Sequence, residues 1–277
     1  MNLMNFPLLV LAFTFVLLFL AAYVGDLLRN KVLPLREEGR EDFSVVLGAT
    51  LTLLALLIGF SFSMAVSRYD QRKNYEEAEA NAIGTEYVRA DLLPATDAAR
   101  VHDLLKKYVD ERVLFYTTRS DQRIAKIDAD TAELQKELWS AVLPGAAAQP
   151  TPPLALVVSG MNDVLNSQGY TQAAWWNRIP IAAWGLMAAI AICCNLLIGY
   201  GAHQTNRRIF LIVPIAVAIA FFLISDIDSP RGGLILVTPQ NLLSLSESLR
   251  SQSVGRRASP PKHWLAPTSS ETPIING

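Results

Sequence analysis

Two adjoining segments decide the fold of this chain: 43-FSVVLGATLTLLALLIGFSFSMAVS-67, and directly after it 68-RYDQRKNYEEAEANAIGTEYVRADLL-93. The first segment carries no charge, and the second contains ten charged residues and no proline. A helix of about 20 apolar residues crosses about 30 Å of hydrocarbon. We therefore predict one continuous helix that spans a membrane over Phe43–Ser67 and continues into water over Arg68–Leu93.

Three further uncharged runs are long enough to cross a membrane: Met1–Gly25, Ile179–Ala202 and Ile209–Ser225. The first run lacks the basic start and the small-residue cleavage site of a secretory signal, so we interpret it as a retained helix. The predicted fold class is all-α, with four transmembrane helices and an extramembrane helical domain. Four spans place the N-terminus, the segment 68–178 and the C-terminus on one side of the membrane.

The predicted domains follow from where charge, proline and glycine gather. The segment 68–178 holds 29 of the 49 charged residues. Residues 144–153 contain four prolines and predict a loop. The divisions are 1–67 (first transmembrane hairpin), 68–178 (helical extramembrane domain), 179–227 (second transmembrane hairpin), 228–250 (a turn with a strand-like Leu234–Val237, then an amphipathic segment) and 251–277 (disordered tail).

Inside the polar domain, a helix is predicted after Pro94 because apolar residues recur there every three or four positions. We expect Glu76, Glu77 and Glu79 to form a solvated helix face beside basic residues. The predicted buried face of the helix after Pro94 consists of Val101, Leu104, Leu105, Tyr108, Val109, Arg112 and Phe115.

Composition excludes several classes of function. The net charge is −1 and no stripe of Lys and Arg occurs, so no nucleic-acid partner is expected. No hydrolase, dinucleotide or phosphate-loop motif occurs. The histidines His102, His203 and His263 are far apart and expected to be exposed, and the adjacent Cys193 and Cys194 are expected to fill space in an apolar helix. We predict neither an enzyme nor a metal or cofactor site.

The four spans contain no Asp, Glu, Lys, Arg or His. Proton-coupled carriers and pumps normally keep an ionisable residue at membrane depth, so this absence argues against an active transporter. A passive pore, a scaffold or a sensor remains.

Two rows on the second span have fourfold spacing. Small residues at Ala55, Gly59 and Ser63 predict a face on which another helix can pack closely. Thr52, Leu56 and Phe60 form a second row, which either lines a pore or faces lipid.

At the boundary of the membrane, Arg68 is predicted to anchor the helix that leaves it. Its partner is either a lipid phosphate or one of the carboxylates Asp226 and Asp228, which lie at a span end on the same side. We expect Arg68 to be the stronger anchor of the two arginines Arg68 and Arg72.

The run Leu57–Arg72 resembles the second transmembrane helix of bestrophins. It contains Gly59-Phe60, and Arg68 follows the phenylalanine by eight positions. The whole layout is similar to a bacterial bestrophin-like domain family of unknown function, including the Asp-x-x-x-Pro-x-x-Gly turn at Asp226–Gly233. The resemblance extends over roughly residues 5–250.

This resemblance implies a homo-oligomer of five subunits in the bilayer. The second span of each subunit would line a neck with Thr52, Leu56 and Phe60. The implied function is an ion channel, for anions, whose apolar ring gates by dewetting. The acidic calcium clasp of the animal family has no counterpart beyond Asp226 and Asp228. The alternative is a non-conducting membrane scaffold or sensor whose helical domain binds a partner protein.

Orientation follows from the resemblance and not from charge. Lys and Arg near the span ends number six on the linker side and five opposite, which decides nothing under the positive-inside rule. Likeness to bestrophins implies a multi-pass protein of the cell (inner) membrane, with the helical domain and both termini in the cytoplasm.

Overall fold

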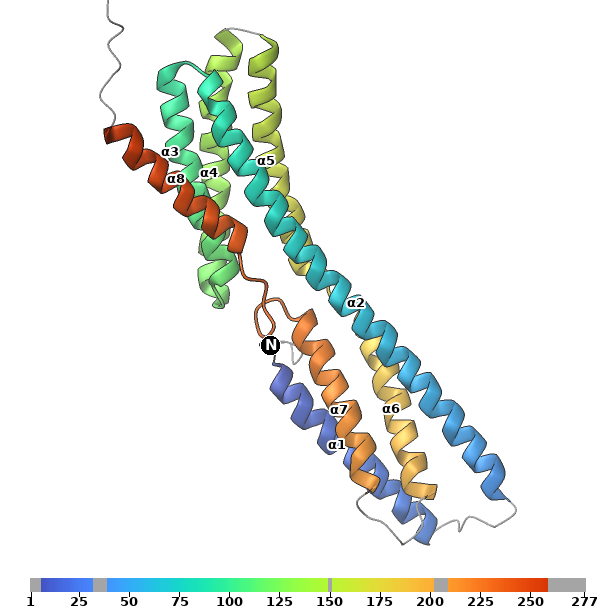
Figure 1. Cartoon of the computed structure of the whole chain (residues 1–277). Helices are drawn as coiled ribbons and strands as arrows, with labels where there is room; N and C mark the ends of the chain where they lie inside the picture. Colours follow the sequence, from blue (N-terminus) through green and yellow to red (C-terminus); the bar gives the residue numbers. More distant parts are fainter. Residues whose placement is uncertain (1–5, 32–38, 149–150, 202–208, 259–277) are drawn as a thin grey trace, which may run out of the picture.

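The computed structural model describes residues 6–31, 39–148, 151–201 and 209–258, and helices make up nearly all of this part (Figure 1). The all-α class is confirmed, and the described residues contain no strand. The helices are α1 (Pro7–Lys31), α2 (Arg40–Arg89), the 3-10 turn η3 (Ala90–Leu92), α3 (Ala95–Thr117), α4 (Asp121–Ala148), α5 (Pro152–Trp176), α6 (Ile181–Gly201), α7 (Ile209–Asp228) and α8 (Gln240–Ala258).

The helices form two bundles that share α2 (Figure 1). One bundle contains α1, α6, α7 and the first half of α2, and these four helices are long and apolar enough to cross a membrane. The other contains α3, α4, α5, α8 and the second half of α2. With 50 residues at about 1.5 Å each, α2 is about 75 Å long and runs through both bundles without a break. The predicted continuous helix is confirmed.

In the membrane bundle, the order of packing differs from the order of the chain. α1 packs on α6 and α7, and the described parts of α1 and α2 make no contact. The two spans of the predicted first hairpin, 1–67, thus follow each other in the chain without packing on each other. Two glycines explain the α1–α6 pairing: a Cβ at Gly25 would overlap the carbonyl of Leu196, and one at Gly199 would overlap the carbonyl of Ala22. Only glycine permits backbones to approach this closely.

The helical domain has its own core between α2, α3, α4, α5 and α8. All seven residues of the face predicted after Pro94 are buried, including Arg112. α3 begins at Ala95, directly after Pro94, as predicted, and Pro94 occupies the capping position.

Three predictions on local structure are wrong. The first is the loop over 144–153, because α4 continues through Pro144 to Ala148. Gly145 explains this difference, since the bare glycine packs against Leu93 and Pro94, and this tertiary contact outweighs the hydrogen bond that Pro144 cannot make.

The second concerns Leu234–Val237, which forms an irregular turn and no strand. The Asp226 carboxylate accepts hydrogen bonds from the amides of Leu234 at 2.6 Å and Ile235 at 2.8 Å, so a side chain takes the donors that a strand partner would use. The third is the start of the tail at 251, because α8 continues to Ala258. Residues 259–277 lie outside the described part.

Candidate functional site

The predicted row on the second span is exposed. Phe60 is 62% exposed, Leu56 is 52% exposed, and Thr52 is also exposed, with its hydroxyl donating to the carbonyl of Gly48. In the same stretch, α2 buries Leu54, Ser61 and Ala65. Successive residues of a helix are about 100° apart, which places the row almost opposite the buried side. α2 thus packs on its own subunit with one side and presents the row on the other.

The exposed row continues beyond the membrane as a polar stripe. Ser63, Ser67, Asp70 and Asn74 follow Phe60 at steps of three or four and are all exposed. We use the name α2 stripe for the row Thr52, Leu56, Phe60, Ser63, Ser67, Asp70 and Asn74. Asp70 is its one charged member. Between Leu56 and Asp70 the stripe therefore changes from apolar to hydroxyl-bearing to acidic.

Basic residues near Asp70 point elsewhere around the helix. Arg72 is only 2% exposed and lies on the packed side. Lys73 is exposed, about 100° from the centre of the α2 stripe by helical spacing. The acidic character of the stripe at Asp70 is consequently not balanced on the stripe itself.

The small-residue row flanks the α2 stripe and meets no helix of its own chain in the described part. Ala55, Gly59 and Ser63 are exposed, and a Cβ at Gly59 would find no atom within 4 Å. The close helix contact within the chain is at Gly25 and Gly199 instead, which the sequence reasoning missed. The spacing Ala22-x-x-Gly25 and the fourfold spacing Asn195–Gly199 were the signals that could have found it.

The predicted boundary residues come together only in part. Arg68 Nη1 lies 3.8 Å from Asp228 Oδ1, and the Asp228 carboxylate also accepts the amide of Ile179 at 3.1 and 3.2 Å. Asp226 does not join them, because its carboxylate caps the turn at Leu234 and Ile235. The Arg68–Asp228 contact links the exit of α2 to the end of α7.

Arg72 is more deeply embedded than Arg68. Its Nη2 donates to the Ile227 carbonyl at 3.0 Å, and its Nε donates to the Arg68 carbonyl at 3.2 Å. Arg68, by contrast, keeps 17% of its side chain exposed. Removing a fully enclosed side chain lowers the free energy of unfolding more than removing a partly exposed one. From the structure we therefore expect Arg72 to be the stronger anchor.

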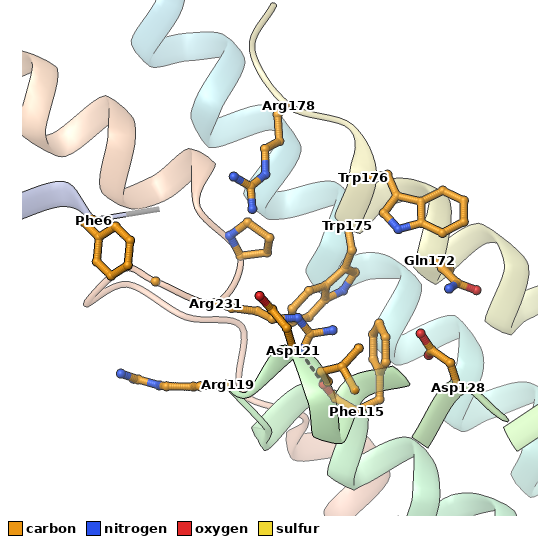
Figure 2. A pocket seen from close by; sticks show the side chains of 13 residues that line it. Phe6, Phe115, Arg119, Asp121, Asp128, Gln172, Trp175, Trp176, Arg178 and Arg231 are labelled. Carbon is orange, nitrogen blue, oxygen red and sulfur yellow. Dashed lines mark hydrogen bonds between the residues drawn. The ribbon is translucent and has the colours of Figure 1, made fainter. Parts of the chain in front are cut away.

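Arg231 is a junction residue that the sequence reasoning missed. Its guanidinium stacks on Phe115 and Trp175, at 4.6 and 4.4 Å from the ring centres, and Nη1 donates to the carbonyls of Phe115 at 2.7 Å and Thr118 at 2.9 Å (Figure 2). Burial lowers the pKa of Arg231 to about 10, against the opposing effect of Asp128. Its place in the Pro-Gly turn after α7 was the available signal. Arg231 fastens this turn to the end of α3.

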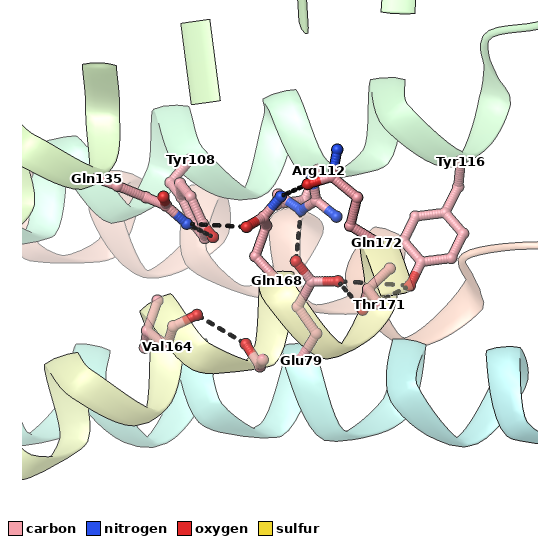
Figure 3. Close-up of polar contacts among 10 residues, drawn as sticks. Glu79, Tyr108, Arg112, Tyr116, Gln135, Val164, Gln168, Thr171 and Gln172 are labelled. Carbon is pink, nitrogen blue, oxygen red and sulfur yellow. Dashed lines mark hydrogen bonds and ion pairs between the residues drawn. The ribbon is translucent and has the colours of Figure 1, made fainter. Parts of the chain in front are cut away.

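A buried ion pair holds the helical domain together. Arg112 of α3 donates from Nε to Glu79 of α2, and neither side chain is exposed (Figure 3). Thr171 of α5 donates to Glu79 at 3.1 Å, and Tyr116 adds its hydroxyl at 3.4 Å. Burial raises the pKa of Tyr116, so it remains a neutral donor. The carboxylate of Glu79 therefore connects α2 to both α3 and α5.

The predicted solvated face is wrong for two of its three glutamates. Glu79 is the buried partner of Arg112, and Glu76 is 1% exposed. Glu76 accepts from the Asn241 side chain at 2.6 Å and from the Leu242 amide at 2.9 Å, which caps the start of α8. Only Glu77 is exposed.

Another buried carboxyl, Glu86, has no hydrogen-bond partner among the described residues. It lies on α2 beyond the membrane-spanning part, and burial raises its pKa to about 8 against the opposing effect of Arg89. Among the described residues no group of three metal-binding side chains occurs. His102 is buried rather than exposed and bonds to the Tyr87 carbonyl at 2.8 Å; His203 and His263 lie outside the described part.

Together these features define a class: a helical membrane protein with four spans, in which one long helix joins the spans to an extramembrane helical domain. The chain belongs to the bestrophin-like family, because the family model described as Bestrophin-like domain matches residues 13–242. Among curated proteins, no sequence matches this chain.

Solved structures of the same fold include bacterial proteins. The chain is similar to a bacterial bestrophin homologue from Klebsiella pneumoniae, with a TM-score of 0.63 and 15% identity, covering 88% of this chain and 98% of that one. A single-substitution variant of a bestrophin homologue from the same organism gives a TM-score of 0.61 and 14% identity, again covering 88% and 98%. At this identity the likeness shows the fold.

The junction yields a first prediction. Arg72→Ala should lower the free energy of unfolding by about 1.5 to 3 kcal/mol, because it removes a charged donor to a buried carbonyl. Arg68→Ala should cost less, because Arg68 Nη1 lies 3.8 Å from Asp228, beyond hydrogen-bond distance, and the Asp228 carboxylate keeps the Ile179 amide. Thermal unfolding of the detergent-solubilised protein measures both. A larger loss for Arg68→Ala would restore the ranking predicted from the sequence.

Proposed function

We propose that the protein is an oligomeric ion channel whose conduction path is lined by the α2 stripe. The observation that carries this proposal is the position of the stripe, opposite the side by which α2 packs on its own subunit. Membership of the bestrophin-like family supports it, because proteins of the bestrophin type are generally ion channels.

A single subunit cannot enclose a path along one helix face. In the membrane half of α2, several large apolar side chains are exposed, and Phe60 and Leu56 are more than half exposed. Copies of the chain arranged around an axis would cover these surfaces, and the small side chains of Ala55 and Gly59 would let neighbouring α2 helices approach closely. The same arrangement turns the stripe toward the axis.

Along such an axis, Leu56 and Phe60 would form two apolar rings one helical turn apart. A narrow apolar ring is a barrier to ions because it loses its water, and widening it restores conduction. Thr52 carries a hydroxyl, so this end of the neck would be wetter. Ser63 and Ser67 offer hydroxyl groups to a hydrated ion on the other side.

The charge of the permeant ion is a separate part of the proposal. The expectation of anions came from the family resemblance alone. Asp70 is the charged residue of the α2 stripe, and a ring of such carboxylates raises the local concentration of cations. We therefore propose that this channel favours cations at the end of the neck that faces the helical domain.

The neck generates the second prediction. Phe60→Ala combined with Leu56→Ala should raise ion flux several-fold in reconstituted liposomes, because both apolar rings become wider and wetter. Phe62→Ala is the matched control, since Phe62 is exposed on the same helix but lies about 120° from the centre of the stripe.

The assembled mass of the protein in detergent must be measured for each variant. Unchanged flux in an oligomer of normal size would mean that the row faces lipid. A monomer or dimer of the unaltered protein would exclude a pore built from one helix per chain, and would favour the scaffold or sensor.

The third prediction concerns charge. Asp70→Asn should reduce the preference for potassium over chloride by about tenfold, since it removes the acidic ring. Reversal potentials under a potassium chloride gradient measure the ratio. Asp103→Asn, an exposed carboxylate on α3, should leave it unchanged. If Asp70→Asn has no effect, Asp70 lies away from the path.

Orientation is also a proposal: we infer from the family that the helical domain and both termini are cytoplasmic. Phe6 at the start of α1 lines the same cavity as Arg119 of the domain, so the described start of the chain lies on the domain side. The side of the membrane is a matter for experiment.

Cysteine labelling provides the fourth prediction. After Cys193 and Cys194 are replaced by Ala, a cysteine at Ser120 should react with a membrane-impermeant maleimide only after lysis, and one at Gly39 should react in intact cells. Both positions are outside the spans, and Ser120 is exposed. The opposite pattern would reverse the orientation and leave four spans.

A further inference from the structure

We propose that the junction between the two bundles binds an anionic glycerophospholipid, with its phosphate at Arg119 and Arg178 and an acyl chain in a groove between α1, α6 and α7. This site is separate from the α2 stripe and does not depend on ion conduction.

The headgroup part of the site is a cavity of about 460 Å³ at the level where the spans meet the helical domain. Its wall includes residues of α3, α4 and α5, together with Phe6 before α1, Arg119 after α3, Arg178 before α6 and Arg231 after α7. Figure 2 shows Phe6 and Arg119 at one side of the opening and Trp176 at the other, with Arg178 and Trp175 between them.

The charge of the cavity suits an anion. Arg119, Arg178 and Arg231 face Asp121 and Asp128, which leaves one positive charge in excess. Arg231 already donates to two backbone carbonyls, and both aspartates raise its pKa. Arg119 is exposed, whereas Arg178 is half-buried and also faces the charge of Asp228, so a phosphate would share Arg178 with its existing contacts. Two arginines of this kind can hold a phosphate with charge-assisted hydrogen bonds.

Two polar groups in the wall still need partners. The Trp175 indole is 5% exposed, and its Nε1 has no hydrogen-bond acceptor among the described residues. An indole N–H can only donate, so it requires an acceptor such as a phosphate oxygen. Asp128 Oδ1 is also buried without a partner there, and it would accept from a headgroup hydroxyl. A headgroup with both a phosphate and a hydroxyl group would supply an acceptor for the Trp175 indole and a donor for the Asp128 carboxylate.

An apolar groove of about 270 Å³ lies alongside, within the spans. Val10, Phe13 and Leu17 of α1 line it, opposite Trp184 and Gly185 of α6 and Phe221 of α7.

The start of α1 contributes to both places, because Phe6 lines the headgroup cavity and Val10, Phe13 and Leu17 line the groove. Phe6, Val10, Phe13 and Leu17 share one helix face by their spacing, and about 16 Å separates the first from the last. An acyl chain lying in the groove would therefore end at Phe6, beside the headgroup cavity. Trp176, which is 73% exposed, fits the headgroup level, where tryptophan is enriched.

The test uses the full-length protein, stripped of lipid in detergent and given equal amounts of phosphatidylglycerol and phosphatidylcholine with the same acyl chains. Native mass spectrometry counts the lipids bound per chain. We expect one phosphatidylglycerol per chain, at least about tenfold over phosphatidylcholine, which corresponds to about 1.4 kcal/mol.

Variants separate the two halves of the site. Arg119→Gln, alone and with Arg178→Gln, should lower phosphatidylglycerol binding toward the level of phosphatidylcholine. Gly185→Leu should abolish binding of both lipids, and it should fold normally because no atom lies within 4 Å of a Cβ at Gly185. The matched controls are Arg123→Gln, exposed outside the cavity, and Gly48→Leu, equally open on α2.

Four results would overturn the proposal. The first is equal binding of the two lipids to the unaltered protein, and the second is unchanged binding in Arg119→Gln and Gly185→Leu. The third is displacement of the lipid by glycerol 1-phosphate at a similar concentration, which would mean that the site binds phosphate alone. The fourth combines two observations: the unaltered protein binds no lipid, and Gly185→Leu changes the number of subunits in the oligomer. That result would mean that the groove is a contact between copies of the chain.

Discussion

The constraint on which the rest of the structure depends is the unbroken helix α2. One rod of 50 residues must lie in hydrocarbon over its first half and in water over its second, and it contributes a side to both bundles. Since the rod is continuous, the orientation of its faces in the membrane also sets the orientation of its faces in the domain. The same rotation that buries Ala65 against the spans buries Arg72 at the junction and Glu79 in the domain.

The charges along α2 show how this continuity is stabilised. Arg72, Glu76 and Glu79 all point to the packed side, and each meets a different element: the end of α7, the start of α8, and Arg112 of α3. Buried charges are costly unless paired, so these contacts admit one arrangement of helices and penalise others. Within the described residues, the exposed side of α2 is left without partners from its own chain, and this is the side that an assembly can use.

The junction also explains why its residues come from distant parts of the sequence. The middle of α2 and the ends of α7 and α5 meet at the membrane boundary. There the Ile179 amide donates to Asp228, and Arg231 donates to the carbonyl of Phe115. Backbone carbonyls and amides at the membrane boundary need hydrogen-bond partners, because the apolar spans offer none. The arginine side chains supply them. The same crowding of arginines and tryptophans leaves a cavity whose chemistry matches a lipid headgroup.

The sequence by itself determined the all-α class, the four spans, the continuous α2 and the buried face of α3, because hydrophobic length and helical period are local properties of the chain. It also identified the row Thr52, Leu56, Phe60 by spacing, although its role as a pore lining is still a proposal. Tertiary structure alone decided that α1 packs on α6 rather than on α2, since a glycine contact such as that of Gly199 depends on which backbone arrives there. It likewise decided that Glu79 is buried. The sequence predicts a solvated carboxylate there, because the arginine that pairs with it, Arg112, lies 33 residues away in the chain.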